Sequence, residues 1–259
     1  MKIQLYQIDA FTNRVFSGNP AAVCPLETWL AEELMQAIAL ENNLSETAFF
    51  VPLDQGYHIR WFTPASEVDL CGHATLASAY VLFTYLDPAR TKVSFQSRSG
   101  LLTVSKQEDL LAMDFPSQPP EPTEAPEILL EGLGRKPLEV HCSEDYFLVF
   151  SSEKEIVDME PDMTKLKKVD KRGIIVTAKG DKVDFVSRFF APKYGIAEDP
   201  VTGSAHCALV PFWAKKLGKR DLIAHQVSKR GGELFCKDQG DRVVISGRAV
   251  AYMQGVISI

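Results

Sequence analysis

The chain has 259 residues, of which 46% are hydrophobic and 24% are charged, so it holds enough apolar material for one large domain or two medium ones. Its formal net charge is −6, from 28 Lys and Arg against 34 Asp and Glu, which disfavours nucleic acid or an anionic membrane as the main partner. The five cysteines are scattered without a CxxC pair, so neither a zinc site nor a disulfide framework is indicated. No apolar run reaches the ~18 residues of a membrane span, and the opening residues alternate as a strand does, so we expect a cytoplasmic protein.

The first half of the chain predicts strands around two helices of different character. Residues 29–42 have apolar side chains on one side only, which is typical of a surface helix, and Thr28 is its expected N-cap. Strand-like runs follow at residues 48–51 and 57–62. Gly72 then opens a second helix over residues 73–86 that is apolar on nearly every face. A hairpin with its turn at Gly100 and a third strand at residues 110–115 complete this half.

A proline-rich stretch at residues 117–126 interrupts this order. Proline at this density forbids a helix or a central strand and favours an extended spacer. We therefore expect an N-terminal lobe over residues 1–116, a linker over residues 117–126, and a C-terminal lobe over residues 127–259.

The second half repeats the first. The block RWFTP at Arg60–Pro64 returns as RFFAP at Arg188–Pro192, and 188 − 60 gives a shift of 128 residues. Each block closes a strand-like run, and Gly203 opens an apolar helix over residues 204–217 as Gly72 opens the first one. A hairpin and a third strand follow in both halves. The shared order of elements indicates a duplicated lobe.

The two apolar helices predict the architecture, because a helix that is apolar all round must be buried all round. Only the neighbouring strands can bury it. We expect an α+β fold of two pseudo-symmetric lobes, each a curved mixed sheet wrapped around a central buried helix. The final segment, residues 249–259, predicts a strand, a turn at Gly255 and a second short strand. It has no counterpart in the first half and could complete either lobe's sheet.

The starts of the two central helices are the expected functional site. A helix N-terminus offers unpaired N–H groups and a positive dipole, and two of them facing one cleft between the lobes suit a carboxylate. Gly72 and Gly203 would let the backbone approach a ligand. The alternative is that they only form ordinary tight turns. Ser204 could donate a hydrogen bond to a carboxylate, or it could only bond to the backbone of its own turn.

His73 and Asp199 are the candidate chemical groups in these loops. His73 could bind or protonate a substrate, or could only bond its own backbone. Asp199 could hold an amine or hydroxyl or transfer a proton, although Asp before Pro is also a common helix cap. At the 128-residue shift Cys71 corresponds to Asp199, and the glycines then correspond only if the second copy carries three extra residues. For Cys71, as for Cys207 and His206, we favour a buried structural role.

The chain resembles the phenazine-biosynthesis PhzF-like family along essentially its whole length. The matching segments, in this order, are Asp9–Thr12, Gly18–Val23, Asn43–Thr47, Arg60–Pro64, Cys71–Thr75 and Asp199–Ala205. The resemblance implies a diaminopimelate-epimerase-like fold, a homodimer, and neither a metal nor an organic cofactor. It assigns Glu46 the role of taking a proton from one carbon and assisting its return elsewhere. It also places His73, Asp199, Ser204, Gly72 and Gly203 around the substrate, and Asn19 becomes a further substrate-binding candidate.

The sequence therefore predicts a cofactor-free isomerase that moves a proton on a small carboxylate-bearing metabolite. A carboxylate in a closed cleft is suited to accept a proton and return it. One alternative is an amino-acid racemase or epimerase that uses Cys71 and Asp199. It is weakened because such enzymes use two opposed cysteines, and Cys207 lies a helical turn too late to be the second. The other alternative is a binding or scaffold protein of the same fold without turnover.

Overall fold

The structure, a computed structural model, describes residues 1–259. Contacts along the backbone divide the chain into two compact units: unit 1 comprises Met1–Asp114 and Ser246–Ile259, and unit 2 comprises Phe115–Ile245. The last segment, whose lobe the sequence leaves open, belongs to unit 1. The proline-rich stretch, expected as a linker between the lobes, belongs to unit 2. That stretch contains a two-residue strand, β9 (Glu121–Pro122), which pairs with β10 (Glu139–Cys142).

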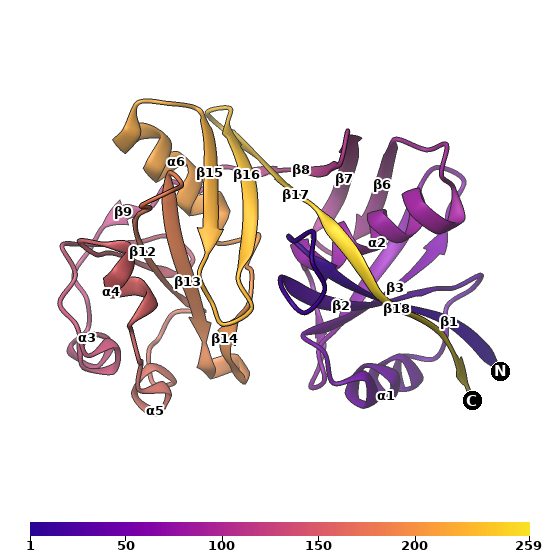
Figure 1. Cartoon of the computed structure of the whole chain (residues 1–259). Coiled ribbons are helices and arrows are strands. Elements are labelled where there is room, and N and C mark those ends of the chain that lie inside the picture. The colour runs from indigo at the N-terminus through magenta and orange to yellow at the C-terminus, as the bar shows by residue number, and fades with distance from the viewer. The chain divides into compact units, whose positions relative to one another are not determined.

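Unit 1 is built on one mixed sheet with the strand order β18-β1-β2-β3-β4-β6-β7-β8, and β5 adds to the free end of β4 (Figure 1). The pairs β2/β3 and β4/β6 are parallel, and the others are antiparallel. The strands are β1 (Lys2–Ala10), β2 (Asn19–Pro25), β3 (Glu46–Pro52), β4 (Tyr57–Phe62), β5 (Glu67–Val68), β6 (Lys92–Ser97), β7 (Gly100–Gln107), β8 (Leu110–Pro116) and β18 (Ala249–Ser258).

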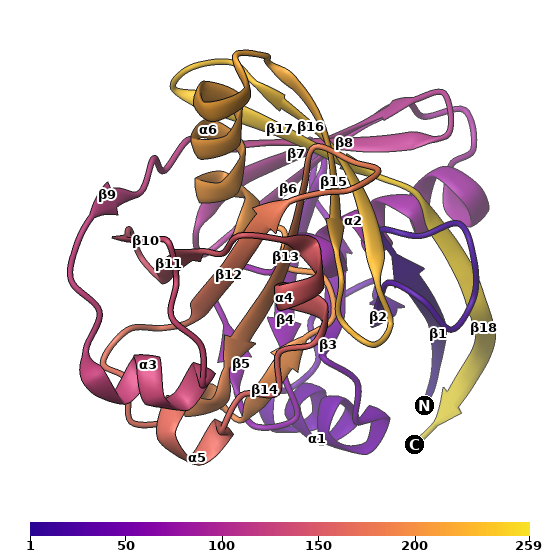
Figure 2. The ribbon, with the colours of Figure 1, turned by 60° about the vertical axis from the view of Figure 1, so that its left-hand side comes forward.

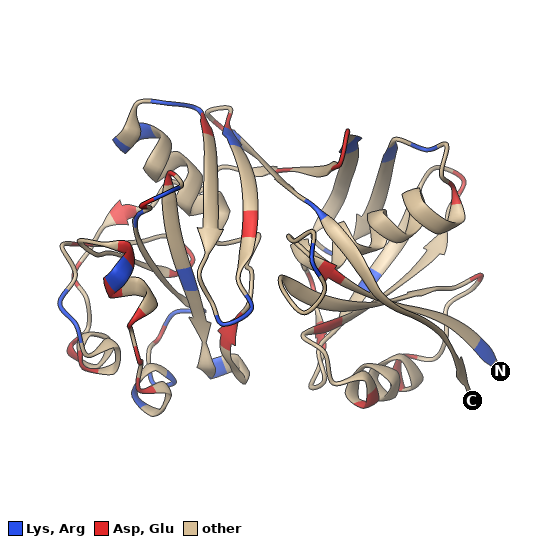
Figure 3. Cartoon of the chain, in the orientation of Figure 1, with Lys and Arg blue, Asp and Glu red and all other residues tan.

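Helix α2 (Gly72–Val81) is the buried helix of unit 1, and a π-helical turn, η1 (Leu82–Leu86), continues it. Every residue from His73 to Ala79 is buried, and the helix packs against β1, β2, β3, β7 and β18. It carries no Lys, Arg, Asp or Glu (Figure 3). The sheet therefore covers this helix as its apolar composition predicts, because no face of it could be left in water.

Helix α1 (Glu32–Asn42) is the two-faced surface helix, and it buries Met35, Ile38 and Ala39 against the sheet. Its expected start at residue 29 with Thr28 as N-cap is wrong. The helix begins three residues later, after Ala31, which has extended backbone angles and makes no side-chain cap. Two glutamates in the first turn complement the helix dipole in place of a cap.

Unit 2 repeats this plan with the strand order β9-β10-β11-β12-β13-β15-β16, and β14 adds to β13. The parallel pairs β11/β12 and β13/β15 occupy the places of β2/β3 and β4/β6. The remaining strands are β11 (Tyr146–Val149), β12 (Ile174–Lys179), β13 (Phe185–Ala191), β14 (Ile196–Asp199), β15 (Asp221–Gln226), β16 (Gly232–Asp238) and β17 (Arg242–Gly247), which runs across the division between the units.

Helix α6 (His206–Leu217) is the central helix of unit 2 (Figure 2). Its Trp213 stacks on Phe185 of β13 and donates through Nε1 to Thr177 Oγ1 of β12. The helix begins at His206 and not at Ser204, because residues 203–205 form a turn before it. Gly218 ends it in the left-handed conformation, which glycine adopts without strain.

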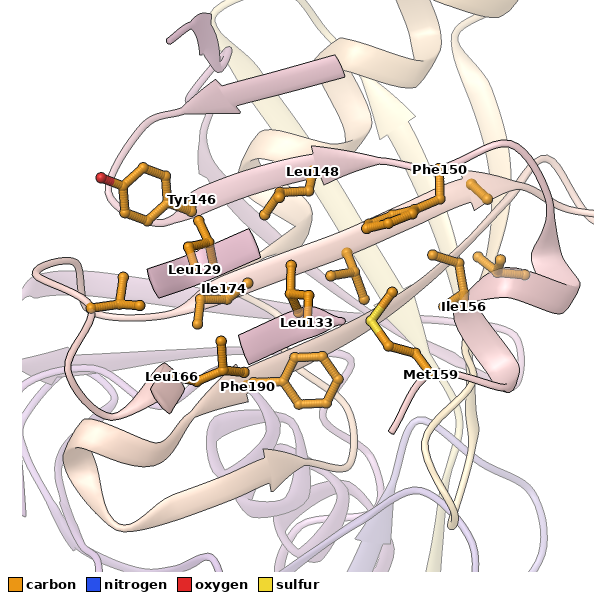
Figure 4. Packing of buried hydrophobic residues seen from close by; sticks show 14 residues of the cluster. Leu129, Leu133, Tyr146, Leu148, Phe150, Ile156, Met159, Leu166, Ile174 and Phe190 are labelled. Atoms are coloured by element: carbon orange, nitrogen blue, oxygen red, sulfur yellow. The ribbon is translucent and has the colours of Figure 1, made fainter. Parts of the chain in front are cut away.

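A second apolar core lies on the other side of the β12/β13 pair in unit 2 (Figure 4). Three short helices supply its outer layer: α3 (Glu127–Leu133), α4 (Glu153–Val157) and α5 (Met163–Leu166). Leu129, Leu133, Ile156 and Leu166 from these helices pack against strand residues such as Ile174 and Phe190. Apolar groups on both faces explain why β12 consists of buried residues from Ile174 to Ala178.

The repeat is reproduced in detail, but its shift changes along the chain. Arg60 forms a two-pronged ion pair with Glu67, and Arg188 forms the same pair with Glu198. The shift is 128 residues at the arginines and 198 − 67 = 131 at the glutamates. The three extra residues lie where unit 2 has a short 3₁₀ turn, η2 (Pro192–Tyr194).

This change of shift corrects the expected correspondence between Cys71 and Asp199. Trp61 pairs with Val68 in unit 1, and Phe189 pairs with Asp199 in unit 2, so Asp199 is the counterpart of Val68. At the same 131-residue shift, the counterpart of Cys71 is Thr202.

The last strand is continuous and belongs to unit 1. Strand β18 pairs antiparallel with β1 from Lys2↔Ser258 to Ala10↔Ala249, so the expected turn at Gly255 is wrong. The one irregularity lies at Tyr252, because Gln7 pairs with Met253 and Ile8 with Ala251. The two chain termini consequently lie close together at one end of unit 1 (Figure 2). Among the helices, none is both long and apolar enough to cross a bilayer.

Candidate functional site

Strand β3 and helix α2 bring Glu46 and His73 into contact in unit 1. Glu46 is the first residue of β3, where it pairs with Ala21 of the parallel strand β2, and His73 is the second residue of α2. Glu46 Oε2 lies 3.1 Å from His73 Nε2. Both atoms are buried, and neither has a hydrogen-bond partner besides this contact. The pair thus keeps bonding capacity for a ligand.

Asn19 and Cys71 surround the other ring nitrogen of His73. Asn19 Nδ2 lies 3.2 Å from His73 Nδ1, and Cys71 Sγ lies 3.5 Å from the same atom. When the Asn19 amide nitrogen faces Nδ1 it donates to that atom, so the imidazole is neutral and carries its proton on Nε2, toward Glu46. When the amide is rotated, its oxygen accepts from a protonated Nδ1, as in the imidazolium. Asn19 can therefore support either charge state of His73.

The three side chains of the site are largely shielded from bulk water. Glu46, Cys71 and His73 are 9%, 6% and 5% exposed. Burial disfavours the imidazolium, but Cys71 and the Glu46 carboxylate favour it, and the net effect raises the pKa of His73 well above its usual value. Burial, together with the charge of Glu46, raises the pKa of Cys71 to about 11. Because Cys71 is then a neutral thiol near pH 7, we regard Glu46 as the partner that holds the proton on His73.

In unit 2 the helix start carries hydroxyl groups where unit 1 has a thiol and an imidazole. Thr202 and Ser204 are the counterparts of Cys71 and His73 at the 131-residue shift. Thr202 Oγ1 donates to Asp199 Oδ2 at 2.6 Å, and Gln226 Nε2 donates to the Asp199 carbonyl at 2.8 Å. Asp199 ends β14 and does not cap α6, which has no side-chain cap. The reading of Asp199 as a helix cap is therefore wrong.

Ser204 has a partner that sequence reasoning missed. Arg172 Nη2 lies 3.3 Å from Ser204 Oγ, and two further bonds, of 3.0 and 2.6 Å, fix the guanidinium on the buried Asp145 carboxylate. By accepting from Arg172, Ser204 keeps its own O–H free to donate. Gly173, which follows Arg172, is the counterpart of Glu46. Thr47 pairs with Phe62 as Ile174 pairs with Phe190, and Glu46 and Gly173 directly precede Thr47 and Ile174.

The close contacts of Gly173 explain part of this difference between the units. A Cβ at Gly173 would lie 2.3 Å from the Phe189 ring and 3.0 Å from Asp145 Oδ1. No side chain can replace Glu46 there while Asp145 holds Arg172. No motif in the sequence marked Arg172 or Asp145, because their meeting depends on the parallel pairing of β11 with β12.

The remaining candidates lie in or near the helix starts. Gly72 is the first residue of α2, and Gly203 lies in the turn before α6. His206 is fully buried, its Nδ1 lies 2.8 Å from the Thr202 carbonyl, and burial lowers its pKa to about 4. Its counterpart Thr75 makes the equivalent bond to the Cys71 carbonyl. His206 therefore stabilises the first turn of its helix.

Comparison with known proteins identifies the family. A family model described as "Phenazine biosynthesis-like protein" (PhzC-PhzF) matches residues 8–255. The chain belongs to this family. It is 53% identical, over 100% of both chains, to a Pseudomonas aeruginosa protein named as an uncharacterized isomerase. It is 40% identical over the full length to the human phenazine biosynthesis-like domain-containing protein.

Solved structures confirm the predicted fold class. A PhzF-family protein from Enterococcus faecalis superimposes with a TM-score of 0.98 at 49% identity, with 100% of both chains covered. A probable proline racemase from Agrobacterium radiobacter matches 99% of this chain and 92% of its own, with a TM-score of 0.67 at 10% identity, which shows the epimerase-type fold alone. Together, the family and its named relatives support an isomerase or epimerase activity for this chain.

Proposed function

We propose that Glu46 moves a proton between two atoms of a small carboxylate-bearing metabolite, without a metal or organic cofactor. The contact between the buried Glu46 Oε2 and His73 Nε2, 3.1 Å apart, carries this proposal. A base that takes a proton from carbon must be close to it and shielded from water, and Glu46 is 9% exposed.

The reaction needs one carboxylate. Glu46 takes the proton of a C–H bond, and the electron pair of that bond moves into the conjugated system of the substrate. Glu46 then returns the proton to another carbon, so the enzyme ends in its starting state. The N–H groups at the start of α2 suit an electron-rich intermediate.

His73 serves this reaction by holding the carboxylate in place, and Asn19 holds His73. An imidazolium 3.1 Å from Glu46 attracts the carboxylate strongly in a site from which water is excluded. Gly72 leaves the backbone beside it open to a ligand. The substrate-binding roles of Asp199, Gly203 and Ser204 and the homodimer stay predictions.

The epimerase alternative would use Cys71 and Asp199 as its two acid–base groups. Two observations favour Glu46 over it. The pKa of Cys71 is raised to about 11 by burial, so little thiolate is present near neutral pH. Asp199 is also not the counterpart of Cys71 in the repeat, so the pair lacks the symmetry of the two-cysteine racemases.

The test compares Glu46→Gln with wild type and with Glu41→Gln, an exposed glutamate in α1. Each protein is incubated in deuterated water with a panel of small carboxylates, and deuterium in the products is measured by mass spectrometry. We expect Glu46→Gln to keep its fold and to lose about 10²- to 10⁴-fold in exchange rate, while Glu41→Gln behaves as wild type.

Undiminished exchange in Glu46→Gln would refute the mechanism. Exchange at an amino-acid α-carbon that is lost in Cys71→Ser and kept in Glu46→Gln would favour the epimerase alternative. Tight binding of a panel member by the wild type without any exchange would favour the non-catalytic alternative.

A further inference from the structure

Glu46, Cys71 and His73 together form a set of metal-ligand atoms. A carboxylate oxygen, the thiol sulfur and an imidazole nitrogen from these residues all lie within 4.8 Å of one another, and no other group of three such side chains occurs in the chain. A tetrahedral Zn²⁺ has bonds of about 2.0–2.3 Å, which place its ligand atoms roughly 3.3–3.6 Å apart. The Cys71 Sγ to His73 Nδ1 distance of 3.5 Å already has this value. Glu46 Oε2 contacts the other ring nitrogen, Nε2, so its side chain has to turn toward Nδ1 to complete the set.

The unsatisfied polar atoms of this cluster point to a ligand. Glu46 Oε2 and His73 Nε2 are buried without a hydrogen-bond partner besides their mutual contact. Apart from that contact the bonding capacity of the Glu46 carboxylate is unused, and an ion that takes Glu46 as a ligand supplies the missing partner. The charge suits a cation once the ion replaces the proton of His73, because a buried carboxylate then faces a thiol that a bound metal deprotonates.

We propose that Cys71, His73 and Glu46 bind one thiophilic divalent cation, of which Zn²⁺ is the biological example, and that the bound ion inhibits the enzyme. The inhibition rests on the proposed function, because a metal-bound Glu46 can no longer accept a proton. On binding, the Cys71 thiol and the His73 imidazolium each release one proton to solvent as the sulfur–metal and nitrogen–metal bonds form. Glu46 binds as carboxylate, which leaves a fourth position for water.

The repeat shows why each chain holds a single site. The counterparts of Glu46, Cys71 and His73 in unit 2 are Gly173, Thr202 and Ser204, which offer neither sulfur nor imidazole. Hydroxyl groups are poor ligands for Zn²⁺. Cys142 is the one cysteine that is not buried, and it belongs to no such cluster, so it provides a matched control.

Titration of the purified chain with Co²⁺ tests the site without any substrate. We expect wild type to bind one Co²⁺ and to develop a near-ultraviolet thiolate-to-cobalt absorption, which Zn²⁺ abolishes by competition. Cys142→Ser should keep this band. Cys71→Ser should lose it, and His73→Gln and Glu46→Gln should each weaken Co²⁺ binding by more than about tenfold.

The proposal is overturned if wild type shows no thiolate band in excess Co²⁺, or if Cys71→Ser keeps the band. Should Cys71→Ser fail to fold, unchanged affinity in both His73→Gln and Glu46→Gln overturns it equally. The metal site and the proton-transfer mechanism are judged separately, since the first is read from Co²⁺ spectra and the second from the turnover of metal-free Glu46→Gln. Inhibition by Zn²⁺ that a chelator reverses supports the regulatory part, and full turnover with Zn²⁺ bound refutes it.

Discussion

Two buried histidines near the starts of the central helices have opposite charge preferences. Burial lowers the pKa of His206 to about 4, because its one polar contact is the Thr202 carbonyl. Burial also works against the His73 imidazolium, yet Cys71 and Glu46 raise the pKa of His73. The difference is one carboxylate, and it marks His73 as a functional group and His206 as a structural one.

The low pKa of His206 predicts a loss of stability in mild acid. The unfolded chain takes up a proton at the ordinary value of 6.5, whereas the folded chain does so only near pH 4. Stability that is present above pH 6.5 is therefore lost as the pH falls through this window, by on the order of 3 kcal/mol in full. We expect His206→Gln, which keeps an N–H donor, to show a flatter pH dependence in urea unfolding between pH 7 and 4.5.

His73 supplies the control with the opposite sign. Its raised pKa gives stability that is fully present below pH 6.5 and is lost as the pH rises through the folded-state value. The stability difference between wild type and His73→Gln should accordingly shrink in alkaline solution. Identical slopes for wild type and His206→Gln in acid would contradict the assignment of His206 as a buried neutral group.

At the scale of single residues, the sequence identified several candidate functional residues, but it did not predict which side chains contact one another. The helix starts marked His73, and the family resemblance marked Glu46. Their contact depends on β3 lying beside β2 in one register, which no local pattern determines. Arg172 and Asp145 stand 27 residues apart and were missed for the same reason.

At the scale of elements, two equivalent arginines, Arg60 and Arg188, differ in the contacts that they make with neighbouring elements. Arg60 stacks on Phe62 and binds Glu67, and Arg188 stacks on Phe190 and binds Glu198. Glu67 has a second partner in Arg98, at 2.6 Å. Arg188 additionally donates to the carbonyls of Ile156 and Met159 at the end of α4. Arg188 thus joins β14 and α4 to β13.

These contacts predict unequal costs for the same substitution. Arg188→Met leaves Glu198 and the Met159 carbonyl without the guanidinium, and we expect a loss of about 2–4 kcal/mol in the free energy of unfolding. Arg60→Met should cost about 1–2 kcal/mol, because Glu67 keeps Arg98 and the other lost ion pair is with the exposed Glu32 of α1. Chemical denaturation of the two variants measures this difference. A larger loss in Arg60→Met would show that the α4 contacts contribute little.

The helices and strands were predicted well where the local residue types determine them, and poorly where their bounds depend on pairing with distant strands. The buried helices and the hairpins follow from apolar runs and glycine turns. The start of α1, the position of the three extra residues between Arg188 and Glu198, and the continuity of β18 through Gly255 were not predicted. A glycine within a strand resembles a turn signal locally, but eight other paired residues of β18 hold Gly255 opposite Leu5.

At the scale of the whole molecule, the chain completes its first unit with its last strand. Strand β2 pairs with β1 only from Tyr6 to Ala10, whereas β18 pairs with β1 from Lys2 to Ala10. The first half of β1 therefore depends on residues that follow at least 250 positions later (255 − 5 = 250). The sequence left this strand unassigned, since its alternation fits either sheet edge.

Removal of residues 249–259 should unfold unit 1 selectively. The deletion leaves Lys2–Leu5 without a strand partner and exposes Ile3 and Leu5, which are now buried. At about 1.5–3 kcal/mol for each such side chain, the loss is about 3–6 kcal/mol, a large part of the stability of an ordinary domain. Unit 2 keeps all its strand pairs, so hydrogen exchange should accelerate in β1 and α2 and stay slow in β12 and β13.

Gly255→Ala is the matched control, because the added methyl group meets no atom within 4 Å, and it should leave both units protected. Equal loss of protection in both units would show that they unfold as one.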